Sequence, residues 1–220
     1  MIAYALASLR EWRVARMRRT VSAAALMLAA AALAGPLQPL ILAIATTAVF
    51  ALSGWADGNG PKPARGDGID PLVFPSRAGA IVSGRILAAL ASWLALCLAL
   101  SPVLAASAIA WGLSSATILS CLLCWLTAYL VGASAGFCSM LAFSGSDGFV
   151  GLLIYLGWIL SSFFAAPFKF SNPFIQAWSL LRLEGGSAPY SGILAEAIVA
   201  AGLFAASALV LSARRRKRDA

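Results

Sequence analysis

The chain contains no histidine and few charged residues. None of its 220 residues is histidine, and charged side chains make up 11% of it. Without histidine, Ser-His-Asp and Cys-His catalysis, H-E-x-x-H zinc sites and His-ligated haem are all excluded. The sequence also lacks G-x-x-x-x-G-K-S/T, so it has no P-loop with which to hydrolyse a nucleotide. We therefore expect no catalytic residue, no metal and no cofactor in this chain.

Apolar residues dominate the composition. They make up 61% of the chain, and charged residues make up 11%, whereas about a quarter of the residues of a soluble domain are charged. This composition predicts a polytopic membrane protein. The net charge of +8 would suggest a nucleic-acid partner in a soluble protein. Here the positive side chains flank apolar segments, so we expect membrane lipid as their partner and no nucleic acid.

The four cysteines all fall within apolar stretches, where a free thiol behaves as a small hydrophobic side chain. Two of them form a C-x-x-C, Cys121 and Cys124, which a helix places on one apolar face without further ligands. We expect these cysteines to pack rather than to bind a metal or carry out redox chemistry.

Fourteen of the sixteen basic residues lie in three clusters, within residues 10–19, 62–85 and 214–218. Basic residues beside membrane spans remain in the cytoplasm. Six spans would place all three clusters, and both termini, on the cytoplasmic side. An odd number of spans would export one cluster.

The pattern predicts an all-α, single-domain membrane helical bundle with six transmembrane helices. A span needs about 20 residues, and Gly35, Pro36 and Pro39 divide the first long apolar run in two. An amphipathic helix at 1–19 is expected to lie on the cytoplasmic face of the membrane. The predicted spans are 20–35, 37–54, 86–113, 114–143, 149–166 and 193–212, joined by a cytoplasmic loop at 55–85 and an outer loop at 167–192 and followed by a basic cytoplasmic tail at 213–220.

Two features within the spans also carry predictions. Small residues from Gly132 to Gly136 indicate a face for close helix packing. Glu196 is expected near the outer end of the last span, where its carboxylate would reach water, and an ion-relay role is the alternative.

Three aspartates, Asp57, Asp67 and Asp70, lie in the Gly- and Pro-rich loop. With Ala64-Arg65 they resemble part of the motif of CDP-alcohol phosphotransferases. However, five residues separate Asp57-Gly58 from Ala64-Arg65, where that family has two. A membrane enzyme of this kind remains an alternative.

Residues 71–101 carry a closer resemblance. Pro75-Ser76-Arg77 and Gly84-Arg85-Ile86-Leu87 are similar to the turn and the helix entry that precede the third span in permease subunits of type-2 ABC exporters. The basic N-terminal segment, the six spans and the basic tail agree with that family's layout. An acidic motif that often precedes the turn is absent, because residues 66–70 read Gly-Asp-Gly-Ile-Asp.

The resemblance implies a transport subunit that is not itself an enzyme. In that family a short cytoplasmic coupling helix between spans 2 and 3 docks onto a separate ABC ATPase subunit, which binds ATP and Mg²⁺, and two permease chains form a homo- or heterodimer. Arg77 and Arg85 would pair with acidic groups of the ATPase or with lipid phosphates. The coupling residues implied are Phe74, Pro75, Ser76, Arg77, Ile81, Gly84 and Arg85.

The nearly uncharged spans predict a pathway lined by apolar and hydroxyl side chains, such as Tyr129, Ser134 and Ser139. This lining favours export of an amphipathic, lipid-like or apolar peptide substrate over a small ion. The haem-exporter permease of cytochrome c maturation is a related alternative, and a non-catalytic membrane scaffold or immunity protein is another class. Richness in alanine and arginine indicates a high-GC bacterium and hence the bacterial inner membrane.

Overall fold

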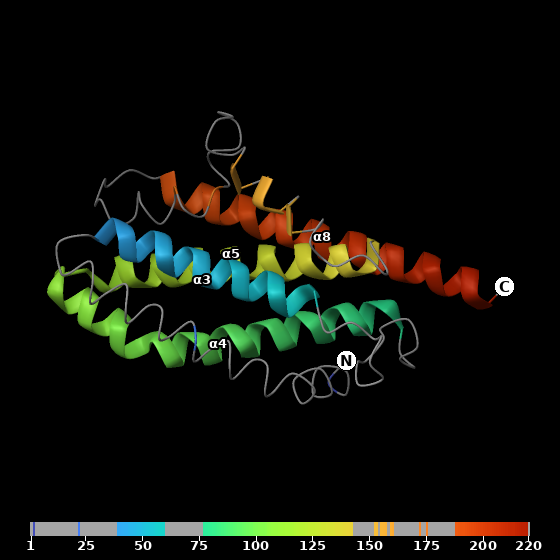
Figure 1. The fold of residues 1–220 in the computed structure, drawn as a ribbon, viewed down its shortest axis with the longest axis horizontal. Coiled ribbons are helices and arrows are strands. Elements are labelled where there is room, and N and C mark those ends of the chain that lie inside the picture. The colour runs from blue at the N-terminus through green and yellow to red at the C-terminus, as the bar shows by residue number, and fades with distance from the viewer. Residues whose placement is uncertain are drawn as a thin grey trace.

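A computed structural model of the chain shows an all-helical protein, and the part of the chain that the structure describes contains four long helices (Figure 1). The structure describes residues 39–59, 77–142 and 188–219, short stretches at 152–153, 155–157 and 159–160, and the single residues Ile2, Ser22, Asn172 and Ile175. The long helices are α3 (Pro39–Asn59), α4 (Ala78–Ala110), α5 (Ser115–Ala142) and α8 (Ala188–Asp219).

Within this described part, three helices are long and apolar enough to cross a membrane: Ala78–Ala110, Ser115–Ala142 and Tyr190–Lys217. Their length and hydropathy identify a multi-pass membrane protein. The predicted spans 20–35 and 149–166, the helix at 1–19 and the outer loop 167–192 lie largely outside the described residues.

Helix α3 extends beyond the predicted second span. We placed Trp55 to Asn59 in a cytoplasmic loop, but α3 continues through Asn59. That boundary was wrong because Gly54 and Gly58, which punctuate an isolated helix, here sit against the backbone of α5. Tertiary packing thereby overrides the weak helix propensity of glycine.

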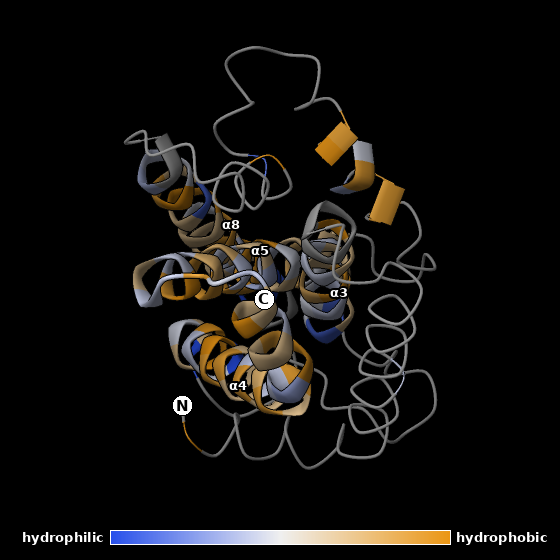
Figure 2. Cartoon of the chain, turned by 90° about the vertical axis from the view of Figure 1, so that its left-hand side faces the viewer, coloured by the Kyte–Doolittle hydropathy of each residue, from blue (hydrophilic) through white to orange (hydrophobic). Residues whose placement is uncertain are grey.

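Helix α5 lies in the middle of the described helices and contacts α3, α4 and α8 (Figure 2). Gly54 lies against Tyr129 and Gly58 against Ala133, so α3 and α5 run parallel. Arg214 of α8 donates to the carbonyl oxygen of Ala142 (3.3 Å), whereas Tyr190 pairs with Ser120 (3.3 Å), so α8 is parallel to α5 as well. Helix α4 runs in the opposite direction.

The α3–α5 interface is a reciprocal pair of G-x-x-x-G motifs. A Cβ added at Gly54 or Gly58 would overlap the carbonyl oxygens of Tyr129 or Ala133, and one at Gly132 or Gly136 would overlap those of Ala51 or Trp55. Each helix therefore presents two glycines to the other helix's backbone. Such close approach is how small residues associate helices in a membrane. The packing face predicted at Gly132–Gly136 is confirmed.

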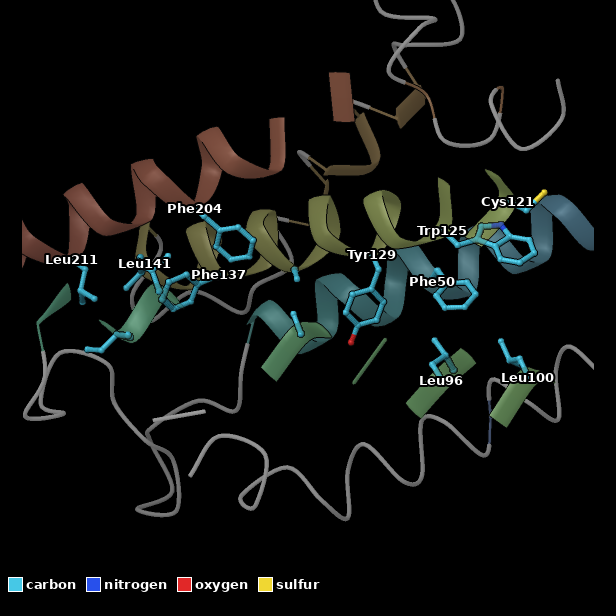
Figure 3. Packing of buried hydrophobic residues seen from close by; sticks show 14 of the residues in the cluster. Phe50, Leu96, Leu100, Cys121, Trp125, Tyr129, Phe137, Leu141, Phe204 and Leu211 are labelled. Atoms are coloured by element: carbon cyan, nitrogen blue, oxygen red, sulfur yellow. The ribbon is translucent and has the colours of Figure 1, made fainter. Parts of the chain in front are cut away.

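Aromatic side chains of α3 and α5 also pack against each other. Phe50 of α3 stacks on Trp125 of α5 with ring centroids 5.6 Å apart and an interplanar angle of 6°. Leu96 and Leu100 of α4 belong to the same cluster of buried residues, which continues along α5 to Phe137 (Figure 3). Parallel stacked rings contribute about 0.5–1.5 kcal/mol beyond their area burial.

A four-residue turn, Trp111 to Ser114, joins α4 and α5. Gly112 has a φ of 60°, which glycine adopts without steric cost. Its amide donates to Ile109 O (3.2 Å) and that of Leu113 to Ala108 O (3.0 Å), the two bonds of a Schellman motif. Ser114 then caps α5 by accepting the amide of Thr117 (3.2 Å). The end of α4 is thereby satisfied by backbone amides and the start of α5 by the side chain of Ser114.

Proline is accommodated inside α4 by a neighbouring hydroxyl group. Pro102 has no N–H to donate to the carbonyl of Leu98, four residues earlier. The hydroxyl of Ser101 donates to that oxygen instead, at 2.7 Å. Because an unsatisfied carbonyl in hydrocarbon would cost several kcal/mol, Ser101 allows Pro102 to lie in a spanning helix.

The glycine interface can be tested by adding one methyl group at a time. We expect Gly58→Ala or Gly132→Ala to lower the stability of the detergent-solubilised protein by about 1–3 kcal/mol, since each methyl would overlap backbone. Gly202→Ala is the matched control, because an added Cβ there meets nothing within 4 Å. Thermal unfolding measures all three. Equal midpoints for Gly58→Ala and Gly202→Ala would refute the close approach.

Candidate functional site at the junction of three helices

The first element of the site is a buried carboxylate held by a phenol. Asp57, in the last turn of α3, is 8% exposed, and Tyr129, in the middle of α5, is 1% exposed. The hydroxyl of Tyr129 donates to Oδ2 of Asp57. This bond links two helices that already touch through glycine, so it fixes their relative position along the helix axes.

Helix α4 brings an arginine to the same place. Arg85 is 7% exposed, and its Nη1 donates to the backbone carbonyl oxygen of Asp57 at 3.4 Å. The guanidinium carbon lies 5.3 Å from the centre of the Phe137 ring, within the range of a cation–π contact. Arg85 therefore contacts both α3 and α5.

The polar groups of Asp57 and Arg85 face a small cavity of about 10 Å³. Its other walls come from α5 and from α8, which contributes Phe204. A volume of this size is about that of a single water. Four helices thus meet at one point, and among the described residues the charged side chains that line it are one acid and one base.

This arrangement is suited to a mechanical role. Burying a charged group costs several kcal/mol unless its polar atoms find partners, and Arg85 reaches the backbone carbonyl of Asp57 only while α4 keeps its place against α3. Any displacement of α4 against α3 would separate Arg85 from Asp57. The junction therefore favours movement of α3, α4 and α5 as one body.

The predicted coupling residues divide into three groups. Phe74, Pro75 and Ser76 lie outside the described residues. Arg77 immediately precedes α4 and is exposed, and its carbonyl accepts the amides of Ala80 (2.9 Å) and Ile81 (3.2 Å). Ile81, Gly84 and Arg85 are buried in the first two turns of α4, which continue without a break into the predicted third span.

The three hydroxyl residues predicted to line a pathway are all buried on α5. The hydroxyl of Tyr129 donates to the carboxyl group of Asp57, and the hydroxyl of Ser134 donates to Val131 O of its own helix at 2.9 Å. The Oγ of Ser139 has no hydrogen-bond partner among the described residues. The structure thus brings Tyr129 into the junction and leaves the two serines inside the helix packing.

A second buried carboxyl group lies away from the junction. We expected Glu196 to reach water, but its side chain is 0% exposed. The Oγ1 of Thr127, close to the midpoint of α5, lies 2.5 Å from Oε2 of Glu196. That prediction was wrong because Glu196 faces α5 instead of the outer surface. The hydropathy along α8 does not indicate which face of the helix packs against α5.

The cysteines and acids form no metal centre in the described part of the chain. All four cysteines are free thiols, and Cys121 and Cys124 are buried, as a packing role requires. No group of three or more Cys, Asp or Glu residues there could hold a metal ion. Asp57 lies within a helix rather than in the predicted loop, while Asp67 and Asp70 lie outside the described residues.

Sequence reasoning missed the pairing of Asp57 with Tyr129 and the burial of Glu196. One available signal was the G-x-x-x-G formed by Gly54 and Gly58, which matches that of Gly132 and Gly136. Aligning the two motifs side by side brings Asp57 and Tyr129 to the same interface.

Compared with protein-family models, curated proteins and solved structures, the chain matches none of them. Its function is therefore argued from its own residues.

The phenol–carboxylate bond can be tested with a double-mutant cycle. We expect Tyr129→Phe to lower stability by about 1–3 kcal/mol, because the buried carboxylate of Asp57 loses a donor. The loss should be smaller in an Asp57→Asn background, since a neutral amide costs less to leave unpaired. Tyr190→Phe removes a phenol that is 59% exposed and serves as the control. Additive effects of the two junction substitutions in thermal unfolding would contradict the bond.

Proposed function

We propose that the chain is the membrane-spanning permease subunit of an ATP-driven exporter in the bacterial inner membrane. It would work with a second permease chain and with a separate ABC ATPase subunit that binds ATP and Mg²⁺. The observation that carries the proposal is the way Arg85 anchors the start of α4 to α3 and α5. That start belongs to the segment that resembles the coupling region of type-2 ABC exporters.

The length of α4 supports a cytoplasmic extension. Its 33 residues span about 50 Å, some 20 Å more than the hydrocarbon core of a bilayer. Arg77 precedes the helix and Arg85 lies in its second turn, so the end that projects is the basic end. In place of a separate short coupling helix, the first turns of the third span would receive the ATPase.

The junction supports transmission of force from that end. A permease driven by a partner's ATP hydrolysis needs an element that passes movement to its spans as a rigid body. Because Arg85 contacts Asp57 of α3 and Phe137 of α5, displacement of the first turns of α4 would move all three helices. A flexible loop in this place would absorb the movement.

The helix directions support six spans. Since α5 and α8 are parallel, the chain returns to the side where α5 begins before it enters α8, and the predicted fifth span would make this crossing. Six crossings put the start of α4 and the ends of α3, α5 and α8 on one side. The described basic residues gather there, which supports assigning this side to the cytoplasm; they are Arg77, Arg85, Arg214, Arg215, Arg216, Lys217 and Arg218.

The proposed substrate class rests on the composition of the spans. No charged residue occurs in α5, and Arg85 is the only one in α4. Spans of this kind would favour an amphipathic, lipid-like or apolar peptide substrate, because dehydrating a small ion between them is unfavourable. Since Tyr129 and Ser134 are engaged within the chain, a pathway between two permease chains would use other side chains.

The orientation can be tested by cysteine accessibility in intact cells. Ser115→Cys lies at the exposed start of α5 and should react with a membrane-impermeant maleimide from outside. Arg77→Cys and Lys217→Cys should react only after the membrane is permeabilised. The parent chain is the background control, since its four thiols lie within apolar segments. External labelling of Arg77→Cys would overturn the six-span arrangement.

The proposal predicts that a P-loop ATPase is encoded beside this chain, and the coupling can be tested by co-purification with that subunit. We expect Arg77→Glu combined with Pro75→Ala to abolish co-purification, because Arg77 is exposed next to the projecting end of α4. Arg216→Glu is the matched control, since it reverses an exposed charge on the same side of the bundle without touching α4. A double variant that retains both the complex and its ATP turnover would refute this docking site.

A further inference from the structure

We propose that the exposed face of α8 near its carboxyl end is a binding site for an anionic phospholipid, in the leaflet on the basic side of the bundle. Two exposed cations, Arg216 and Lys217, hold the phosphate, and the apolar face that leads away from them holds an acyl chain. The site does not depend on an ATPase partner, so its test is independent of the proposed function.

Helix α8 carries basic residues past the end of its neighbour α5. Arg214 donates to the carbonyl oxygen of Ala142, the last residue of α5, and α8 continues for five further residues to Asp219. Figure 1 shows this end of α8 projecting beyond α4 and α5. Since α5 is uncharged up to Ala142, residues 215–218 lie where the hydrocarbon layer gives way to lipid headgroups.

The charge at this level complements a phosphate group. Residues 214–218 are all basic, and Asp219 is the one acid among the last seven residues of the chain. Arg216 and Lys217 are exposed there. Clusters of four or more basic residues next to a membrane span attract anionic lipids. Because the backbone is helical through this segment, both cations are held at a fixed depth.

An apolar face leads from these cations toward the middle of the membrane. Ala213, Leu209 and Ala205 are exposed and follow Arg216 at spacings of three and four residues, which places all four on one side of the helix. Leu209 is 72% exposed. The rise from Arg216 to Ala205 is about 16 Å, close to half of a hydrocarbon core of about 30 Å. The face therefore has the length of one acyl chain with a cation at its end.

The same cations disfavour a second copy of this chain on this face. Two copies packed through it about a two-fold axis along the membrane normal would bring Arg216 and Lys217 of one chain beside the same residues of the other. Like charges placed together at an interface are unfavourable. A lipid phosphate neutralises them instead, and an anionic lipid does so without a positive headgroup of its own.

Native mass spectrometry of the purified protein tests the site by counting bound lipids. With equal concentrations of palmitoyl-oleoyl phosphatidylglycerol and phosphatidylcholine, we expect the parent chain to retain mostly phosphatidylglycerol. Arg216→Gln combined with Lys217→Gln should lose this preference, because the phosphate loses both cations. Arg77→Gln is the matched control, since it removes an exposed cation that precedes α4 on the same side. A double variant that keeps the parent's preference would overturn the proposal.

The apolar part of the site is tested at Leu209. We expect Leu209→Asn to reduce retention of phosphatidylglycerol, because a polar side chain then lies against the acyl chain. Leu119→Asn is the control, since Leu119 is 59% exposed but lies near the opposite end of α5. Equal retention in the two variants would show that no chain lies along this face of α8 and would contradict the site.

Two further arms exclude other occupants. Glycerol 1-phosphate carries the phosphate without acyl chains, so it should not displace phosphatidylglycerol, and displacement would point to a soluble ligand instead. Ala205→Cys should form no disulfide-linked dimer when native membranes are oxidised. A dimer that is absent from the parent chain would place a second copy on this face and would overturn the lipid site.

Discussion

Close backbone contact between α3 and α5 is the constraint on which the rest of the structure depends. Hydrophobic burial does not drive helices together in lipid, because lipid tails are as apolar as leucine. Gly54 and Gly58 meet Tyr129 and Ala133 so closely that no side chain fits between them. In this register the phenol of Tyr129 reaches Asp57. Arg85 of α4 in turn donates to the backbone carbonyl of Asp57.

Buried charged residues of the described helices lie at two levels of the bundle. Arg85 donates to the backbone carbonyl of Asp57 and lies over Phe137, which favours movement of α3, α4 and α5 together. Glu196 contacts Thr127 at the midpoint of α5, away from this junction. The first arrangement suits transmission of force, and the second connects α8 to α5.

Composition and small-residue patterning were sufficient to predict the helical class, the membrane location and the packing face at Gly132–Gly136. They were insufficient to predict the end of α3. Glycine alone predicts a helix end at Gly58, but the contact of Gly58 with the backbone of α5 favours the helix there. They were also insufficient for Glu196, because α8 is apolar on every side and its pattern does not reveal which face meets α5. Both errors concern contacts between segments about 70 residues apart, which local hydropathy does not encode.

The parallel course of α3, α5 and α8 has an electrostatic consequence. Each helix carries a macrodipole with partial negative charge at its carboxyl end, and in these three helices that end lies on the same side. The side that receives the arginines would therefore be electronegative without them. Arg214 of α8 already donates to the last carbonyl of α5, at Ala142. The basic residues at the end of α8 thus lie where they oppose the aligned dipoles of the bundle.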